Sequence, residues 1–357
     1  MASLSTTMRS LWRAGSKCST VTRNRSSWHP TTSASGVGLS SQLQQHFSST
    51  SSLVRTPIDV KMTKFQILSD LHLEVSPSTH GPEYGYSTFH ITPRAPYLAL
   101  LGDIGLVAQP DALRQFLLTQ LGQFKIVFFL SGNHEPYSSS WEAVGLFLEE
   151  LSVLVSQRRK EGEELGEFVP LDRTRYDIKK SEEGVGAVTV LGCTLHSHVP
   201  DQYKEAVTRR LNDFYRIKDW TVEDHNRAHD VDKKWLNQQL GIIEQQDAGA
   251  EDKRKVVVFT HHSPTADKRA NDPRHQLVEG WEATSSAFRT DLSQEKCWRS
   301  DRVKLWAFGH THFNCDFWVD DEKEKGKRVC TNQKGYGSIP GSRGLSPGFD
   351  IDKVVEV

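Results

Sequence analysis

Short, largely apolar runs recur along the chain after residue 62, and a small or polar residue follows each of them. The five clearest runs are 65–68, 97–101, 126–130, 256–259 and 305–308. Runs of this length that are rich in β-branched and aromatic residues are typical of buried strands in an α/β sheet. We therefore predict strands at these five positions, and two more at 187–191 and at the terminal residues 354–357.

Helical periodicity fills several of the intervals between these runs. Residues 111–121 have apolar side chains at helical spacing, and the stripe from Val144 to Val155 follows the capping-box pattern Ser139-x-x-Glu142. A second capping box, Thr221-x-x-Asp224, precedes a long helix that continues through Leu240. The alternation of strands and helices predicts one α/β domain over residues 62–357.

Two segments break this alternation. Residues 157–184 are charged and interrupted by glycine, and we interpret them as a surface excursion around a short edge. Residues 263–301 are polar and partly helical. Long connections between strand ends often shape the mouth of an active site, and we expect that role for the second segment.

Side chains that commonly bind metal ions follow the five clearest runs. They are Asp70 and His72, Asp103, Asn133, His261, and His310 and His312. Ligands in α/β sheets gather at the carboxyl ends of the strands, so we expect these side chains at one rim. Carboxylate, amide oxygen and imidazole suit hard or borderline dications, and two ions about 4 Å apart need a shared ligand. Asp103, with two oxygens, is the natural bridge.

The pairs Asp70-x-His72 and His310-x-His312 share a spacing of two residues. In extended backbone, side chains repeat every second residue, so both members of each pair would point the same way. We therefore expect extended backbone at both pairs.

The ordered motifs D-x-H, G-D, G-N-H-E, a lone His and G-H-x-H resemble those of the calcineurin-like metallophosphoesterase superfamily, over roughly Lys64 to Val319. The flanking segments 132–142, 191–195, 216–226 and 347–350 resemble a largely uncharacterised microbial and fungal branch related to Ser/Thr phosphatases. The resemblance implies an α/β fold, a four-layer α-β-β-α sandwich of two mixed sheets. It also implies a metal-dependent phosphoesterase.

The same resemblance implies a role for each motif residue. Asp70, His72, Asp103 and His312 would hold one divalent ion, and Asp103, Asn133, His261 and His310 would hold the other. The ions would be manganese, iron or zinc. A metal-bridging hydroxide would attack phosphorus in line, and the catalytic His134 would assist the departing oxygen. We expect Glu135 to support the site by accepting a proton from a ligand imidazole.

Departures from the family pattern reduce the number of candidate reactions. Protein phosphatases of the superfamily clamp phosphate with arginines at the positions of Val107 and Tyr137, and purple acid phosphatases have a tyrosine ligand at the position of Leu106. Both classes are disfavoured. A phosphodiesterase, a diphosphate hydrolase or a broad phosphomonoesterase remains. The alternatives are a non-catalytic metal-binding interaction module of the same fold, or a nuclease.

Other residues with candidate chemistry have simpler interpretations. We prefer His261 to His262 as the ligand, because neighbours in a strand point to opposite faces. The pair His225 and His229 lacks the glutamate of a zincin motif, so we expect a satisfied or solvated helical pair. His196 and His198 are predicted loop residues, Tyr137 and Trp281 are predicted packing aromatics, and 320–328 is a predicted hairpin turn.

The first 61 residues differ in composition from the rest. They contain seven basic residues, one acidic residue and many serines, which is the composition of a mitochondrial transit peptide. A disordered tail, or translation from Met62 with a cytoplasmic product, is the alternative. Residues 62–357 then have a net charge of −7, which argues against nucleic acid and favours a small phosphorylated substrate.

The remaining composition is consistent with a protein outside the membrane and without disulfides. The five cysteines form no C-x-x-C pair, which favours free thiols in a reducing compartment. No apolar run approaches the roughly 18 residues that span a bilayer.

Overall fold

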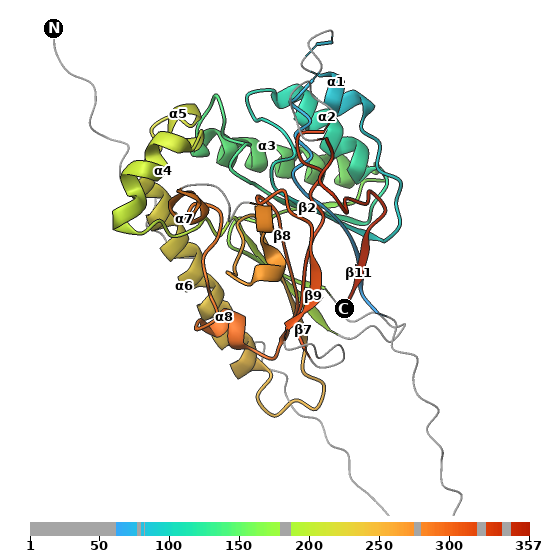
Figure 1. The fold of residues 1–357 in the computed structure, drawn as a ribbon. Helices are drawn as coiled ribbons and strands as arrows, with labels where there is room; N and C mark the ends of the chain where they lie inside the picture. Colours follow the sequence, from blue (N-terminus) through green and yellow to red (C-terminus); the bar gives the residue numbers. More distant parts are fainter. Residues whose placement is uncertain are drawn as a thin grey trace, which may run out of the picture. The chain divides into compact units, whose positions relative to one another are not determined.

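The seven predicted strands all form, and they are divided between two mixed sheets (Figure 1). In this computed structural model the described residues are 62–76, 80–81, 83–178, 187–274, 280–319, 326–337 and 344–357. The predicted transit peptide lies outside these residues, and so does most of the predicted turn at 320–328.

The first sheet has five strands in the order β11-β1-β2-β3-β4. Their bounds are β1 Lys64–Leu68, β2 Tyr97–Leu101, β3 Ile126–Leu130, β4 Glu167–Pro170 and β11 Val354–Glu356. The strands β1 to β4 are parallel, and β11 pairs antiparallel with β1. The carboxyl ends of β1, β2 and β3 therefore lie at the same edge.

The second sheet has six strands in the order β5-β6-β7-β8-β10-β9. Their bounds are β5 Thr174–Ile178, β6 Val188–Cys193, β7 Lys255–Thr260, β8 Val303–Phe308, β9 Asp316–Trp318 and β10 Arg328–Thr331. The strands β6, β7, β8 and β10 are parallel, whereas β5 and β9 pair antiparallel at the two edges. The antiparallel pairing of β9 with β10 is that of the predicted hairpin.

Alternating side chains of each strand divide the core into layers. Ile67 and Phe128 of the first sheet pack against Val257 and Phe259 of the second, so the two sheets face each other. The opposite face of the first sheet packs on α2 (Pro110–Leu121) and α3 (Trp141–Lys160). The opposite face of the second sheet packs on α6 (Val222–Gln246) and α8 (Lys296–Arg299). These are the four layers that the resemblance implied.

The helix starts follow the capping chemistry of the sequence, with one shift. Thr221 and Asp224 form the predicted capping box at the start of α6. At α3, however, Ser140 caps the helix by accepting from the backbone N–H of Ala143, so the predicted cap at Ser139 is wrong by one residue. None of the described helices is both long enough and apolar enough to cross a membrane.

The first of the two irregular segments contains regular structure that was not predicted. Residues 157–184 contain the end of α3 and the strands β4 and β5, so two strands were missed there. The shorter helices are α1 Tyr84–Thr88, α4 Lys204–Arg210, α5 Asp213–Arg216 and α7 Trp281–Ser285, with 3-10 turns at Asp201–Tyr203 and Lys268–Ala270. A small separate core, which includes Val207, Leu211, Val222 and Ala287, holds α4 and the segment after α7 together.

Candidate metal centre and catalytic pocket

The seven side chains predicted as ligands lie together at the carboxyl ends of strands from both sheets. Two groups have their ligand atoms within 4.8 Å of one another: Asp70, His72 and His312, and Asp103, His261 and His310. The amide oxygen of Asn133 lies 3.1 Å from His261 Nε2 and so belongs with the second group. The resemblance implied these two groups with Asp103 in both, and in the structure Asp103 lies in the second group.

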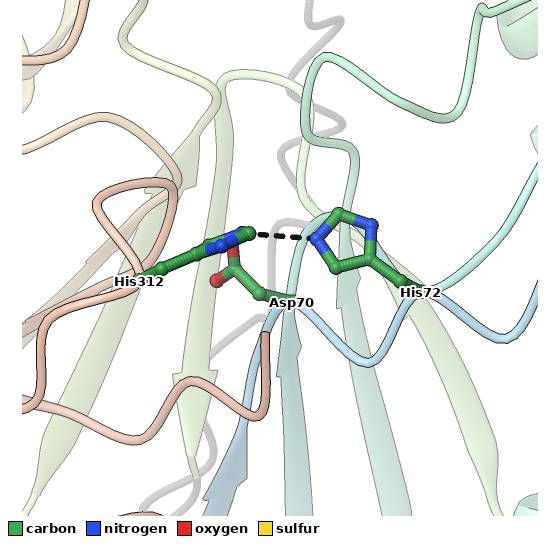
Figure 2. A group of neighbouring side chains, drawn as sticks. All are labelled: Asp70, His72 and His312. Atoms are coloured by element: carbon green, nitrogen blue, oxygen red, sulfur yellow. Dashed lines mark hydrogen bonds and ion pairs between the residues drawn. The ribbon is translucent and has the colours of Figure 1, made fainter. Parts of the chain in front are cut away.

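The first group joins the end of β1 to the loop after β8. His72 and His312 point toward each other above Asp70 (Figure 2), with 3.0 Å between their Nε2 atoms. His312 Nε2 also lies 3.2 Å from Asp70 Oδ1. The Asp70 carboxylate is held by the Ser69 hydroxyl and by the backbone N–H of His310. Three ligand-type atoms therefore converge on one point.

The second group crosses between the two sheets. His261, after β7, donates its Nδ1–H to the carbonyl of Leu101 in β2, at 2.9 Å. This bond leaves Nε2 free to face Asp103 Oδ1, 3.4 Å away. Asn133 donates its amide N–H to the buried Asp213 at 2.8 Å, which turns its oxygen toward His261. The ligand-type atoms of His261 and Asn133 are thus oriented by a bond made on the far side of each side chain.

The backbone at these positions differs from the prediction. Five of the seven residues have a left-handed backbone, with φ of 51° at Asp70, 47° at His72, 55° at Asp103, 68° at His310 and 50° at His312. The expectation of extended backbone was wrong because the chain turns sharply at the end of each of these strands. A left-handed conformation at a non-glycine residue costs on the order of 1–3 kcal/mol, and such strain is concentrated at functional sites.

Two glycines of the motifs are required by close packing. A Cβ at Gly102 would collide with His261 Nδ1 and with the backbone of Gly132, and its φ of 90° also favours glycine. A Cβ at Gly132 would collide with the Asp103 carboxylate and the His261 ring. The glycines therefore let three strand ends approach closely enough for their ligand-type side chains to meet.

Glu74 is a site residue that the motif analysis missed. Its Oε1 accepts from His134 Nδ1 at 2.9 Å and lies 3.3 Å from His72 Nδ1. Burial acts to raise the pKa of Glu74, but the hydrogen bonds with His134 and His72 outweigh it and lower the pKa to about 2. One carboxylate oxygen thus orients both a ligand imidazole and the predicted catalytic imidazole. The signal was the period of two from Asp70 through His72 to Glu74.

Glu135 has a different role from the one predicted. Its buried carboxylate accepts from the backbone N–H groups of Gly132, Asp103 and Ile104, at 2.7, 3.1 and 2.8 Å. Burial, together with the charge of Asp103, raises the pKa of Glu135 to about 7. The predicted imidazole partner is therefore wrong, and Glu135 instead ties the loop after β2 to the loop after β3.

A sequence comparison identifies the class of protein. A sequence profile described as calcineurin-like phosphoesterase matches residues 63–314. The chain belongs to this family. It is therefore a metal-dependent hydrolase of phosphoesters.

Two individual proteins are similar to this chain. An uncharacterized protein of Acanthamoeba polyphaga mimivirus is 23% identical over 305 residues, which cover 82% of this chain and 99% of that protein. The crystal structure of a phosphopantetheinyl hydrolase from Mycobacterium tuberculosis aligns with a TM-score of 0.49 and 16% identity, covering 77% of this chain and 90% of that one.

The side chains of the candidate centre have the properties of a site for divalent ions. His310 Nε2 is buried and has no hydrogen-bond partner. His72 Nε2 and His312 Nε2 face each other, and the bond of His72 Nδ1 to Glu74 favours a lone pair on His72 Nε2. Buried nitrogens without partners are costly unless an ion or water binds them. The mixture of carboxylate, amide oxygen and imidazole therefore fits the ions that this family uses.

Neither residue at the positions of the protein-phosphatase arginines has a positive charge that could clamp phosphate. Val107 is buried in the core beneath α2. Tyr137 is also buried, and its hydroxyl donates to Asp213 at 2.6 Å. Tyr137 therefore supports Asn133 through Asp213. The interpretation of Tyr137 as a buried aromatic residue is confirmed.

A pocket of about 530 Å³ opens above the candidate centre. Its floor includes Asp103, Asn133, His134, His310 and His312, and its wall includes Arg210, Phe288, Tyr336 and Leu345. The Tyr336 hydroxyl lies 3.4 Å from His134 Nε2. The wall includes residues from α4, from α7 and the segment after it, and from 335–336 and 344–347. The predicted role of segment 263–301 at the mouth is confirmed by Asp272, Arg274, Thr284 and Phe288, which all line this pocket.

The other histidines lie behind the centre. His262 is buried with its ring centroid 4.1 Å from that of His310, while His261 is the one that faces Asp103. His225 and His229 are buried, so a solvated pair is excluded, and each ring has one nitrogen close to backbone or hydroxyl groups of residues 195–197. His196 packs between Trp141 and Trp220 and does not line the pocket.

Proposed function

We propose that this protein is a dinuclear metal-dependent phosphoesterase that acts on a small phosphorylated substrate: a phosphodiester, a diphosphate or a phosphomonoester. The observation that carries the proposal is that two neighbouring ligand groups meet one pocket, whose floor includes Asp103, Asn133, His134, His310 and His312. Neither group is complete without residues from both sheets. The spacing is therefore a product of the whole fold and not of one local motif.

Asp103 is the residue proposed to join the two ions. Its charge acts on imidazoles of both groups. Burial lowers the pKa of His72, and the charge of Asp103 opposes that change. Burial also acts to lower the pKa of His261, but the charge of Asp103 outweighs it and the pKa is raised to about 10. In our proposal Asp70, His72 and His312 hold one ion with Asp103, and Asn133, His261 and His310 hold the other. When bound, the ions would activate water for in-line attack and neutralise charge on the phosphoryl group.

His134 is proposed to assist the leaving group. Its backbone N–H donates to Asp103 Oδ1 at 2.8 Å, and its Nδ1 is held by Glu74. This leaves Nε2 directed toward the pocket beside Tyr336. Positioned in this way, the protonated ring can donate to the departing oxygen, and Glu74 stabilises its positive charge.

The pocket and the charge of the chain favour a small substrate. A volume of about 530 Å³ is in the usual range for small-molecule sites. The net charge of −7 on residues 62–357 is the opposite of the positive charge that a nuclease uses to bind nucleic acid.

The test is hydrolysis by the full chain after its metal ions have been removed by chelation. Manganese, ferrous iron or zinc is then added back singly, and release of p-nitrophenolate from p-nitrophenyl phosphate and bis(p-nitrophenyl) phosphate is followed. We expect two ions per chain by elemental analysis and activity only with metal. Asp103→Ala should lose bound metal and activity, whereas Asp111→Ala, at an exposed position, should keep the metal content and the activity of the unaltered chain.

Two results would contradict the proposal. Undiminished hydrolysis by the metal-free protein would exclude metal catalysis. Binding of two ions without hydrolysis of any ester in a broad panel would favour the non-catalytic interaction module.

A further inference from the structure

The wall of the catalytic pocket contains an arginine whose charge is not matched by a neighbouring carboxylate. Arg210 is the last residue of α4 and lines the same pocket as Asn133 and His134. Its Nη1 donates to the carbonyl of Gly280 and to the hydroxyl of Thr284, both at 3.0 Å. Both acceptors are neutral. Within the part of the chain that the structure describes, no ion pair involves Arg210.

The neighbouring arginines show that this state is specific to Arg210. Arg274 also lines the pocket, but its guanidinium forms two parallel hydrogen bonds to Asp272. Arg209 precedes Arg210 in the sequence, pairs with Glu205 and does not line the pocket. Arg210 thus combines a place on the pocket wall with an uncompensated charge.

Two hydrogen bonds orient the exposed side chain of Arg210 in the absence of a ligand. The two hydrogen bonds hold one edge of the guanidinium against α7 and the residue before it. The small core that includes Val207, Leu211 and Ala287 holds α4 against the same segment. A guanidinium held on one edge can still offer donors on its other edge, in the planar arrangement that matches the oxygens of phosphate or carboxylate.

The pocket that Arg210 lines also has apolar and aromatic residues suited to contact with an organic group. Phe288 stacks on His310 with 4.6 Å between ring centroids. Leu345 is largely exposed at the pocket, and the Tyr336 ring lies beside His72. Apolar and aromatic surface therefore lies on the same pocket wall as Arg210 and beside the candidate ligands.

We propose that Arg210 binds a second oxyanion of the substrate, so that the substrate class is a phosphate ester carrying a further phosphate or carboxylate on its organic part. This inference rests on the proposed function of the centre. It assigns recognition to Arg210 in a family member whose two protein-phosphatase clamp positions are the buried Val107 and Tyr137.

Three matched esters test the proposal. Thymidine 5′-(p-nitrophenyl phosphate) has no second oxyanion, and its 3′-phosphate and 3′-hemisuccinate derivatives add a phosphate or a carboxylate. Release of p-nitrophenolate reports only on the 5′ ester. The metal-loaded full chain, Arg210→Gln, Arg210→Lys and the control Arg209→Gln are compared by kcat/KM on each ester.

We expect Arg210→Gln to lose about 10- to 100-fold in kcat/KM on the derivatives that carry a recognised oxyanion, which is the range for a charge-assisted hydrogen bond. The plain ester should be unaffected. Arg210→Lys should retain part of the preference, and Arg209→Gln all of it. A loss on the 3′-phosphate alone identifies phosphate as the recognised group, and a loss on both derivatives identifies any oxyanion.

An equal loss on all three esters would overturn the proposal, because it would assign Arg210 to holding the pocket wall together. No loss on any ester would overturn it as well. Thermal unfolding of each variant shows whether the wall has been damaged.

A binding measurement separates this proposal from the proposed function. Titration calorimetry of metal-loaded protein compares thymidine 3′,5′-bisphosphate with thymidine 5′-monophosphate, and it needs no turnover. Failure of the unaltered chain to hydrolyse any of the three esters would exclude phosphodiester hydrolysis, one of the three activities in the proposed function. Tighter binding of the bisphosphate that disappears in Arg210→Gln would still support the oxyanion site, and equal affinities would overturn it.

Discussion

The floor and the wall of the pocket are built in different ways. The floor consists of side chains placed at the ends of paired strands, buried and oriented by a second bond, as His261 is by Leu101. The wall consists of side chains on connections, such as Arg210 and Leu345, that are exposed and held by few contacts. This difference suggests that reaction chemistry is fixed by the sheets, whereas substrate choice can vary with the connections.

The largest effect is expected at the floor. Glu74→Gln should lower kcat by about 10- to 100-fold with little change in KM, because the substitution weakens the orientation of both His134 and His72. Steady-state kinetics and elemental analysis of bound metal measure the two consequences separately. Glu74→Asp should restore part of the activity.

The exposed Glu149→Gln on α3 provides the control and should behave like the unaltered protein. A change in KM alone in Glu74→Gln would place Glu74 in substrate binding and remove it from the positioning role.

A smaller and more selective effect is expected at the wall. Leu345→Ser should raise KM for esters with a bulky aromatic group by roughly threefold to tenfold, since it removes apolar surface from the pocket. The kcat should stay the same. Leu146→Ser on α3 is a matched control, because Leu146 is 55% exposed and Leu345 is 53% exposed. A fall in kcat in Leu345→Ser would show that the wall also controls the chemical step.

The smallest effect concerns the left-handed backbone of the floor. In the metal-free protein, His312→Gly should be more stable than His312→Ala by about 1 kcal/mol, because only glycine adopts a φ of 50° without strain. Urea denaturation measures the difference, and both variants should be inactive. The same pair of substitutions at Thr311, whose φ is not positive, should show the reverse order. Equal stability of the two His312 variants would mean that the floor stores no strain.

The sequence predicted the floor well because its signals are local. Each ligand-type residue lies within four residues of the end of an apolar run, and the strands β2 and β3 have the predicted bounds. The left-handed turns at Asp70 and His310 could not be predicted, because a spacing of two residues is compatible with an extended strand and with a turn.

The supporting contacts of the floor were less visible. Glu74 continues the alternation of Asp70 and His72 and could have been found. Asp213 gave no signal, because its bond to Asn133 joins residues 80 positions apart. Arg210 was missed for the same reason, since its partner Thr284 is 74 positions away.

The hydrogen bond from His261 to Leu101 has a consequence for the molecule as a whole. It connects a residue after β7 to a strand of the opposite sheet, so the distances among the ligand-type atoms depend on how closely the two sheets are pressed together. An ion bound there would link the two sheets, and the free energy of its binding would add to the stability of the folded chain. By the same linkage, a cavity between the sheets, made for example by shortening Phe259, would weaken binding of the ion although no ligand residue had been changed.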